Sequence, residues 1–484
     1  MSRNKGKRQH GAGVARPAVL AVNVQAPIIT KPTGTRVRYV INGELEALTA
    51  LHVGTGEARV FTALQTDSTD RPEVARLVRD HRSRPYLPGT TVKGLLRRVA
   101  EGLLARDAAD ALLGTIKAAG GGTMGSLLVR GAAESRSGDA RGMPYSERLA
   151  EELGPGIFIA ARTSIDRHEG TAAHNRLFFQ EMVAPGARYR LSLLLEARAR
   201  RTTRDSLDDA IAVLVELTGA AGWAIGKGQS EGQGRVRLDP KSVTIDEIVL
   251  DRNATLKSQS TQRWNANAAP RSALTAVPEE ELILGCPGPF FIVDSSHVPQ
   301  RGPDGEPTGP QVLAQRSGGG PLILGSSLLG VLRSRAAWLE ALRFHREGDD
   351  RNADTIDDPD RAFASAATLT SIERLFGVTG FRGLIELRAL EVLAGKTASF
   401  TSVKLDRFSG APIDNGLFTT DAFVDTKLRV RLALTKRGDW PSEDDKSLFG
   451  RLIGDICANG IVLGHRGNAG FGWFTVEREV SHAA

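Results

Sequence analysis

The chain has 484 residues, of which 41% are hydrophobic, and this is enough for two domains with a core each. Its net charge of +7 suits a polyanionic partner, whereas an aromatic content of only 5% argues against a protein that stacks many single-stranded bases on rings. The two cysteines lie far apart without a metal-ligand pattern and no apolar run is long enough to span a membrane, so we expect a cytoplasmic protein without a zinc site or disulfide.

The N-terminal part of the chain predicts an arm, a strand and a helix in that order. Residues 1–35 begin with the basic run MSRNKGKRQH and are expected to be a flexible arm, which either contacts RNA or has no role. The alternating stretch at 36–54 predicts a strand. Apolar residues at helical spacing over 92–103 predict a helix, which we expect Thr90 and Thr91 to cap.

Further strands and a second helix complete the first half of the chain. Strands are predicted at 127–130 and at about 188–197, on either side of a long hairpin region. A helix is predicted from Ser206 to Leu217, and a last strand follows a glycine motif that ends at Gly234. The order β-α-β-β-α-β is that of the ferredoxin-like unit, which RNA-recognition modules also use.

The second half repeats this order about 240 residues later, and its second helix is expected to begin at Ser442. PYLPGTTVKGLLR at 85–97 matches PLILGSSLLGVLR at 321–333. The hairpin motif around Asp166 returns around Asp406, and a G-x5-G-x-G motif closes both halves. Three motifs in one order at nearly one spacing indicate an internal duplication.

The duplication predicts the fold class and the division of the chain. We expect an α+β protein made of two tandem ferredoxin-like domains. The expected division is a basic arm at 1–35, a first domain at 36–240, a linker with some structure of its own at 241–278, and a second domain at 279–484.

The turn before the first helix of each half is a candidate site for a phosphate. PGTT and LGSS place glycine and hydroxyl groups at a helix N-terminus, where unpaired NH groups and the helix dipole favour an anion. Such a turn is usually only a helix start, but its occurrence twice in a basic protein favours the anion site. The residues assigned to RNA binding here are Gly89, Thr90, Thr91, Lys93 and Arg97 in the first half and Gly325, Ser326, Ser327 and Arg333 in the second.

The two glycine motifs are a second candidate contact. Glycine lets a ligand approach the backbone closely, and neighbouring cations supply charge. Tight hairpins need glycine as well, so the motif alone is weak. The residues assigned here are Gly226, Lys227, Gly228, Gly232, Gly234 and Arg235 in the first half and Gly464, His465, Arg466, Gly470 and Gly472 in the second.

Taken together, these motifs resemble the RAMP superfamily of CRISPR-associated proteins. The resemblance is carried by PYLPGTTVKGLLR, LFGVTGFRGLIELR, the two DR-centred hairpins and the terminal GKGQSEGQGRV and GHRGNAGFGWF. The sequence is most similar to backbone subunits of type III effector complexes, in a tandem-fused form like that of some type III-D systems. The resemblance implies binding of a guide RNA and of complementary target RNA, together with other effector subunits that include the large signalling subunit and small subunits.

The resemblance also implies a β-hairpin thumb in each half that intrudes into the duplex of guide and target. The thumbs are expected at about 156–186 and 394–424. Their candidate wedge residues are Ile165, Leu177 and Phe178 in the first and Leu405, Leu417 and Phe418 in the second, although packing within the hairpin explains them equally well. The cations assigned to RNA binding there are Arg162, Arg167, Lys404 and Arg407.

Cleavage of the target RNA is implied at a loop aspartate that follows the first strand. Asp67 and Asp70 are the candidates in the first half, and Asp67 is preferred as the ligand of Mg²⁺ or Mn²⁺, although a solvated loop aspartate is an equally good explanation. In the second half Asp294 and Asp304 are available as catalytic residues, but neither falls at the clearly matching position. The first half is therefore the better candidate for cutting.

Two alternatives to target-RNA cleavage stay open. One is a guide-RNA scaffold without catalysis, and the other, less favoured, is an endoribonuclease that processes precursor RNA through a histidine or tyrosine. His168, His174 and His465 have no obvious partner in the sequence. A need for a divalent metal would separate target cleavage from precursor processing.

Overall fold

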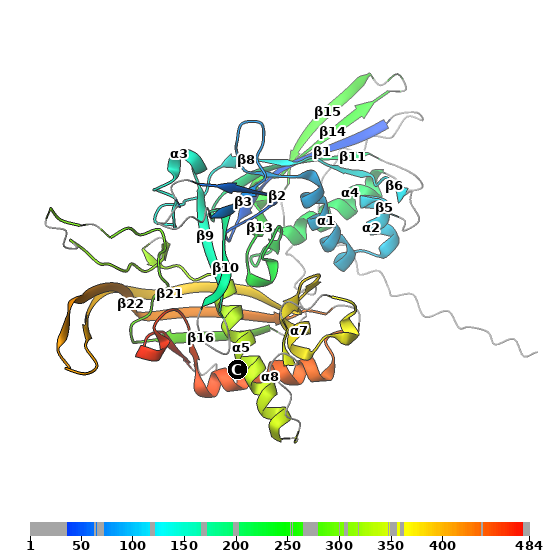
Figure 1. The fold of residues 1–484 in the computed structure, drawn as a ribbon. Coiled ribbons are helices and arrows are strands. Elements are labelled where there is room, and N and C mark those ends of the chain that lie inside the picture. Colours follow the sequence, from blue (N-terminus) through cyan, green and yellow to red (C-terminus); the bar gives the residue numbers. More distant parts are fainter. Residues whose placement is uncertain are drawn as a thin grey trace, which may run out of the picture.

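The two halves of the chain form two sheet-and-helix units that lie one above the other in Figure 1. The structure is a computed structural model. It describes residues 36–61, 64, 72–116, 122–165, 172–196, 203–251, 253, 255–264, 279–299, 301–303, 308–317, 319–346, 348, 356–358, 363–436 and 439–477. Side chains are not described at 164–176, 366 and 414–415. The expected arm at 1–35 lies outside these ranges.

The sheet of the first half is built around strand β1 (Arg36–Ala47), which pairs antiparallel with β11 (Arg188–Glu196). Every second residue of both strands is buried, because helices cover only one face of the sheet. Those helices are α1 (Gly89–Leu103), α2 (Arg106–Leu113) and α4 (Thr203–Leu217). The other strands of this sheet are β4 (Tyr86–Leu87), β7 (Leu127–Val129), β8 (Ala132–Arg136), β12 (Trp223–Ala224) and β13 (Arg235–Leu238).

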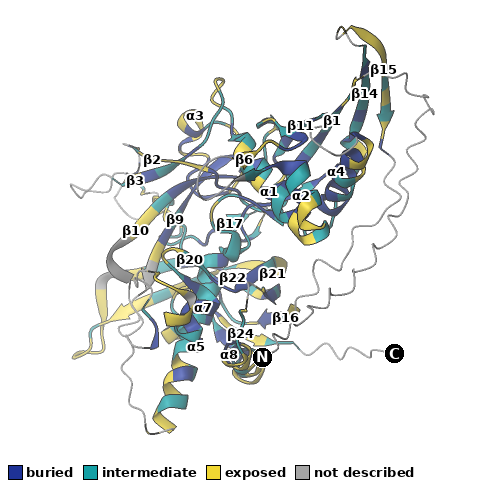
Figure 2. Cartoon of the chain, turned by 90° about the vertical axis from the view of Figure 1, so that its right-hand side faces the viewer, coloured by how far each residue is buried: buried dark blue, intermediate teal, exposed yellow. Residues whose placement is uncertain are grey.

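The described part of the expected linker, 241–278, belongs to this sheet as well. After the short helix η3 (Pro240–Ser242) the chain reverses and β14 (Thr244–Leu250) pairs with the outer part of β1. Strand β15 (Leu256–Arg263) then pairs with β14 and is mostly exposed (Figure 2). This differs from the expectation because β13 covers only the last residues of β1 and leaves its outer edge open to another strand.

A second, four-stranded sheet of the first half carries the predicted hairpin. Strands β9 (Ile157–Ile165) and β10 (Ala172–Val183) form the hairpin, and β3 (Glu73–Leu77) and β2 (Gly54–Val60) extend the sheet on the β10 side. The smaller elements of this half are α3 (Ala150–Leu153), the hairpin β5 (Thr115–Ile116) and β6 (Gly122–Thr123), and the 3₁₀ helix η2 (Gln229–Glu231).

The second half repeats the arrangement with longer strands. Its five-stranded sheet has the order β21-β22-β16-β24-β23, and α5, α7 and α8 pack on it. The helices are α5 (Gly325–Arg346), α7 (Ser371–Phe376) and α8 (Glu443–Asn459). The strands are β16 (Glu279–Cys286), β21 (Ile385–Leu405), β22 (Pro412–Leu434), β23 (Ile461–Val462) and β24 (Trp473–Val476). The smaller elements are β17 (Arg316–Ser317), β18 (Gly320–Pro321), β19 (Gly377–Val378), β20 (Phe381–Arg382), η5 (Ala366–Thr368) and η6 (Gly467–Ala469).

Each half has an antiparallel sheet with helices packed on it and a long hairpin, and this α+β fold confirms the predicted fold class. The predicted cap of the first helix is wrong. Pro88 is the N-cap residue of α1, and Thr90 and Thr91 lie inside the first turn. The proline ring fixes the backbone φ at a value that suits the residue before a helix, so the helix begins here without a side-chain hydrogen bond. In the second half the expected start at Ser442 is confirmed, because Ser442 forms a capping box with Asp445.

The glycine motifs of the two halves have the same backbone. Gly234 and Gly472 have φ of +71° and +69°, and their NH groups donate to Ala50 O and Pro289 O at 2.8 Å in both cases. An added Cβ would collide with Ile225 O in the first half and with Leu463 O in the second. Glycine is therefore required at this position in both loops.

We predict that Gly472→Ala lowers the free energy of unfolding of the full chain by about 1–3 kcal/mol, because the side chain forces strain onto a left-handed residue. Gly454→Ala is the matched control. Gly454 lies inside α8 with open space around it, so alanine there is expected to stabilise by about 0.5–1 kcal/mol. Denaturant midpoints of both variants measure this, and equal midpoints would contradict it.

Candidate nucleic-acid interface

A cavity of about 450 Å³ opens between the N-terminal turns of α1 and the glycine loop of the first half. We call it the groove. It is lined by Thr90, Thr91 and Arg98 of α1, by Gly226 and Gln229 of the loop, and by Arg382 of the second half. The turn predicted to bind a phosphate and the glycine motif were predicted separately, and both face the groove. The second half completes the lining of the groove.

Two guanidinium groups from different halves meet in the groove. Arg98 Nη1 donates to Gln229 Oε1 at 2.8 Å, and Arg382 Nη1 donates to the same oxygen at 2.9 Å. Burial lowers the pKa of both arginines, and for Arg98 the charge of Arg382 lowers it further. Glu386, 3.6 Å from Arg382, offsets part of the repulsion between the two guanidinium groups, and an anion in the groove would relieve the rest.

The start of α1 adds to the positive character of the groove. No side chain in the described part of the chain caps this helix. NH groups in the first turn of a helix without a side-chain cap remain available to an anion, and the helix dipole has its positive end there. Lys93 lies in the same turn and is partly exposed. A phosphate is the chemical group that fits this combination of donors.

The corresponding place in the second half is much less basic. Arg97 Nη2 donates to Gly114 O and Arg333 Nη1 to Gly377 O, so these two arginines are equivalent. The next residue is Arg98 in the first half but Ser334 in the second. Leu329 likewise stands where the first half has Lys93. The first half therefore carries more positive charge along the start of its first helix than the second half does.

In both halves the glycine loop contacts the hairpin through a cation and an aromatic ring. Lys227 Nζ lies 5.9 Å from the ring centroid of Phe178, and the Arg466 guanidinium lies 5.2 Å from that of Phe418. The neighbouring leucines point away from the core, since Leu177 is 60% exposed and Leu417 is 64% exposed. The structure thus brings the predicted loop and hairpin residues together and leaves apolar side chains beside them for a ligand.

Several arginines assigned to RNA binding have structural partners instead. Arg235 is buried and binds Glu386 and the carbonyl oxygens of Ala221, Gly222 and Leu387. Its guanidinium is not presented to a ligand, so this assignment was wrong. A motif arginine with five donors is well suited to hold loop carbonyls, and the sequence does not separate that role from phosphate binding.

Arg97, Arg333 and Arg162 are also engaged within the protein. Arg97 is held by Asp110 and Gly114, and Arg333 by Asp357 and Gly377, so both fix the turn that precedes a short hairpin. Arg162 is buried and donates to Glu231 at 2.7 Å. We therefore place none of these three at the ligand.

His465, which was also assigned to RNA binding, does not supply a positive charge. Its ring stacks on Phe291 with centroids 5.8 Å apart, and burial lowers its pKa below 6.5. The ring is therefore neutral at pH 7 and acts in packing. Gly226, Gly228, Gly232, Gly464 and Gly470 all have positive φ, so they shape the loops as expected.

The remaining hairpin residues are partly described. Lys404, Leu405 and Arg407 are exposed near the tip of the second hairpin. Phe408, at that tip, is fully exposed and was not predicted. Arg167 lies outside the described residues, and for Ile165 only the backbone is described, at the end of β9.

Ser326, Ser327 and Gly325 lie in the first turn of α5. Gly325 approaches the first half so closely that a Cβ would collide with Glu231 O. This turn therefore receives the loop of the first half, and the predicted anion site there competes with a protein contact. Arg98, Gln229 and Arg382 were missed because they lie far apart in the chain: Arg98 meets Gln229 only in the folded first half, and Arg382 reaches both through the packing of the two halves.

The candidate acidic residues are mostly outside the described chain. Asp67, Asp70 and Asp304 are not described, and Asp294 Oδ1 accepts a hydrogen bond from Ser296 N at 2.9 Å within a turn. Within the described ranges, no group of three or more histidine, cysteine or acidic residues is gathered for a metal ion. The described strand β3, next along the chain, pairs with the hairpin strand β10 through Val74 and Phe179.

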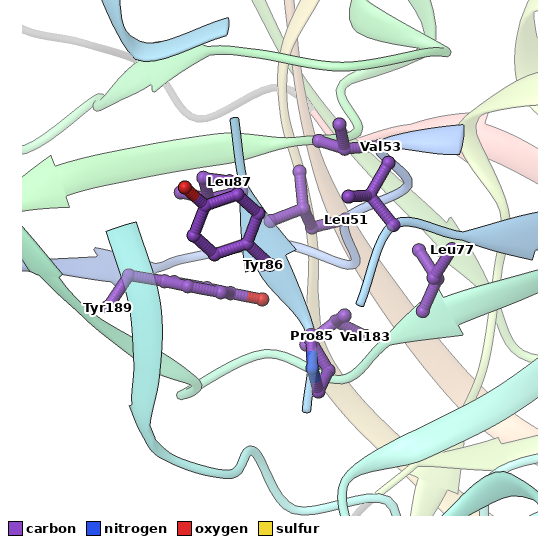
Figure 3. Close-up of a pocket in the computed structure, with 9 residues that line it drawn as sticks. Leu51, Val53, Leu77, Pro85, Tyr86, Leu87, Val183 and Tyr189 are labelled. Carbon is purple, nitrogen blue, oxygen red and sulfur yellow. The ribbon is translucent and has the colours of Figure 1, made fainter. Parts of the chain in front are cut away.

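One other cavity lies in the core of the first half (Figure 3). Its volume of about 10 Å³ is about that needed for a single water molecule. Leucine, valine and proline side chains surround it together with Tyr86 and Tyr189, and Figure 3 shows the Tyr189 ring edge-on below Tyr86. It is a packing defect and not a ligand site. None of the helices in the described ranges is long and apolar enough to cross a membrane.

A family model of the RAMP superfamily matches two stretches of the chain, residues 44–237 and 302–475. The two stretches coincide with the two sheet-and-helix units, and together they cover most of the chain. Among curated proteins, none gives a significant match.

We predict that Arg98→Gln and Arg382→Gln each weaken the binding of single-stranded RNA to the full chain. Each removes one cation from the groove, so the slope of log K against log salt should become shallower by about 1 per variant. Lys446→Gln, an exposed lysine of α8 that pairs with Glu443, is the charge-matched control. Fluorescence anisotropy at several salt concentrations measures this; equal slopes for all three variants would refute the groove.

Proposed function

The chain belongs to the RAMP superfamily of CRISPR-associated RNA-binding proteins, and from this premise we propose that it is a guide-RNA-binding backbone subunit of a type III effector complex. The observation that carries the proposal is the groove in which Arg98 and Arg382 meet beside the uncapped start of α1. It offers a phosphate NH donors and two positive charges at once.

The geometry supports a path for an RNA strand from the groove to the hairpin. Gly226 lines the groove, and the next residue, Lys227, lies over the ring of Phe178 on the hairpin. Phosphates would be held at the groove and along the loop, and bases would meet the exposed Leu177 and Phe178. The same loop and hairpin contact recurs at Arg466 and Phe418, so one chain would hold two successive segments of the guide.

We further propose that the first half cleaves the complementary target RNA. Asp67 and Asp70 lie on the segment between β2 and β3, and β3 is paired to the hairpin strand β10, so this segment begins and ends beside the place where the duplex would be. Aspartate oxygens are the hard ligands that Mg²⁺ and Mn²⁺ prefer, and a divalent ion there would stabilise the negative charge that develops on the phosphate. The second carboxylate would accept the proton of the attacking 2′-hydroxyl group.

A purely structural role is favoured for the second half. Asp294 is engaged by Ser296 in a turn, and the first helix of the second half has Ser334 where the first half has Arg98. The second half would hold guide RNA without cutting. Large signalling and small subunits would bring the other activities of the complex.

RNA that co-purifies with the chain and its partner subunits is predicted to consist of repeat-derived guides of defined length. Sequencing of the bound RNA measures this. Random cellular fragments would contradict the guide-binding role, whereas guides bound without target cleavage would leave only the scaffold function.

The complex that carries Asp67→Ala together with Asp70→Ala is predicted to lose target cleavage by at least about a hundredfold while it still binds target RNA. Asp444→Ala, an exposed aspartate of α8, is the control, and Asp294→Ala should leave the products unchanged. Gel analysis of labelled target with and without Mg²⁺ measures both. Unchanged cutting by the double variant would disprove the catalytic assignment.

A further inference from the structure

A buried carboxylate on the hairpin strand β10 holds the end of strand β3. Glu181 is only 1% exposed, and its Oε2 accepts a hydrogen bond from Leu77 N at 3.0 Å. Arg79 Nη2 donates to the same oxygen at 3.2 Å, and Arg79 Nη1 donates to Leu153 O at 3.0 Å. We call Arg79 and Glu181 the clamp. Hydrogen bonds between charged groups are strong, and burial keeps salt from screening them.

The clamp adds to a short backbone contact. Strands β3 and β10 pair in parallel through only two residue pairs. Glu181 follows directly after the second of these pairs, so its side chain continues the contact where the ladder ends. Strand β3 comes directly after the segment that holds Asp67 and Asp70. The clamp therefore fixes the strand at the C-terminal end of that segment against the hairpin.

Glu181 also links the hairpin to the glycine loop. Its backbone oxygen accepts a hydrogen bond from His52 Nδ1 at 2.7 Å, and His52 O accepts one from Lys227 N at 2.9 Å. His52 is buried. One residue of β10 thus connects three parts of the first half, which are the hairpin, the glycine loop and β3.

The second half has an equivalent of the clamp about 240 residues later, at Arg316 and Asp421. Arg316 Nη2 donates to Asp421 Oδ2 at 3.1 Å. Asp421 N donates to Val312 O at 2.9 Å, so this hairpin strand also contacts the strand that carries the arginine. The ion pair is therefore part of the duplicated plan, although no sequence motif pointed to it.

The link through a histidine differs between the halves. Phe291 stands at the position of His52, because its backbone oxygen accepts from His465 N as that of His52 accepts from Lys227 N. A phenylalanine ring has no NH group to donate to the hairpin. The clamp and the histidine link occur together in the first half, which is the half proposed to cut.

We propose that Arg79 and Glu181 are positioning residues for cleavage of the target RNA, an inference that rests on the function proposed above. The hairpin presents the exposed Leu177 to the duplex, and the clamp sets where β3, and with it the segment of Asp67 and Asp70, lies relative to that contact. A displacement of about 1 Å at a reacting centre costs about a hundredfold in rate. Glu181 is buried and acts through β3 without touching the RNA.

The test measures single-turnover cleavage and target binding by the assembled complex. We expect Glu181→Gln to slow cleavage about tenfold to a hundredfold at saturating target while target affinity stays within about twofold, because only positioning is lost. Glu181→Asp keeps a carboxylate, as the second half does, and should cut faster than Glu181→Gln. Asp421→Asn is the matched control, since it breaks the equivalent pair in the second half and should leave rate and products unchanged.

Hydrogen exchange of the same complexes separates displacement from misfolding. In Glu181→Gln the amides of β3, including Leu77, should exchange faster while those of α4 keep their protection, because only β3 loses its charged partner. Should Glu181→Gln fail to assemble, Arg79→Lys, which keeps the charge, must slow cleavage without weakening target binding. Failure of both variants to assemble would make the pair structural and overturn the proposal.

The outcomes distinguish the positioning role from the proposed function. Four results would overturn only the positioning role: unchanged cleavage by Glu181→Gln, a loss of rate matched by a loss of target affinity, no faster cutting by Glu181→Asp, or equal slowing by Asp421→Asn. A wild-type complex that does not cut, or a double variant at Asp67 and Asp70 that cuts like the wild type, would defeat the proposed cleavage and the positioning role with it.

Discussion

The glycine loop of each half is held by backbone hydrogen bonds that leave no room for a side chain, and the other functional features depend on it. In the first half Ile225 N donates to Gly234 O and Gly234 N to Ala50 O, each at 2.8 Å. This closes the loop in one conformation, which places Gln229 between two arginines and Lys227 over the hairpin. It also places Arg235 in the contact between the two halves, which we call the junction. The groove, the contact with the hairpin and the junction thus all depend on the conformation of one loop.

The two copies keep this backbone but differ in what surrounds it. The first has Lys93 and Arg98 along its first helix, and the second has Leu329 and Ser334 at the matching positions. Since the sheet order and loop conformation are shared, the difference is one of charge and not of shape. A duplicated protein can in this way keep one geometry for a repeating ligand and concentrate affinity in one copy.

The elements of the fold could be predicted from the sequence wherever a local signal decides them. The alternation of apolar and polar residues predicts β1 and β11, and the serine at position 442 predicts the start of α8. The strand β14 could not be predicted as part of the sheet, because it forms on an edge of β1 that only the folded sheet reveals.

The residues of the candidate site also differ in whether a local sequence signal could identify them. The turn at Thr90 and the loop at Gly226 were found from local motifs, and they do line one groove. Arg98 and Arg382 were not found, because they lie far apart in the chain and meet only across the junction. Arg235 was misassigned for the opposite reason, since charge is visible in a sequence but burial is not.

The position of Arg382 has a consequence for how binding and folding are linked. A phosphate in the groove would contact the first half directly and the second half through Arg382, so RNA bound as we propose would bridge the halves. Fusion into one chain keeps the second half near the first and raises the effective concentration of its arginine. Such a ligand would in turn stabilise the junction, because it would bind only the arrangement in which both guanidinium groups face the groove. The repulsion between Arg98 and Arg382, which Glu386 offsets only in part in the free protein, would thereby become a preference for the polyanion.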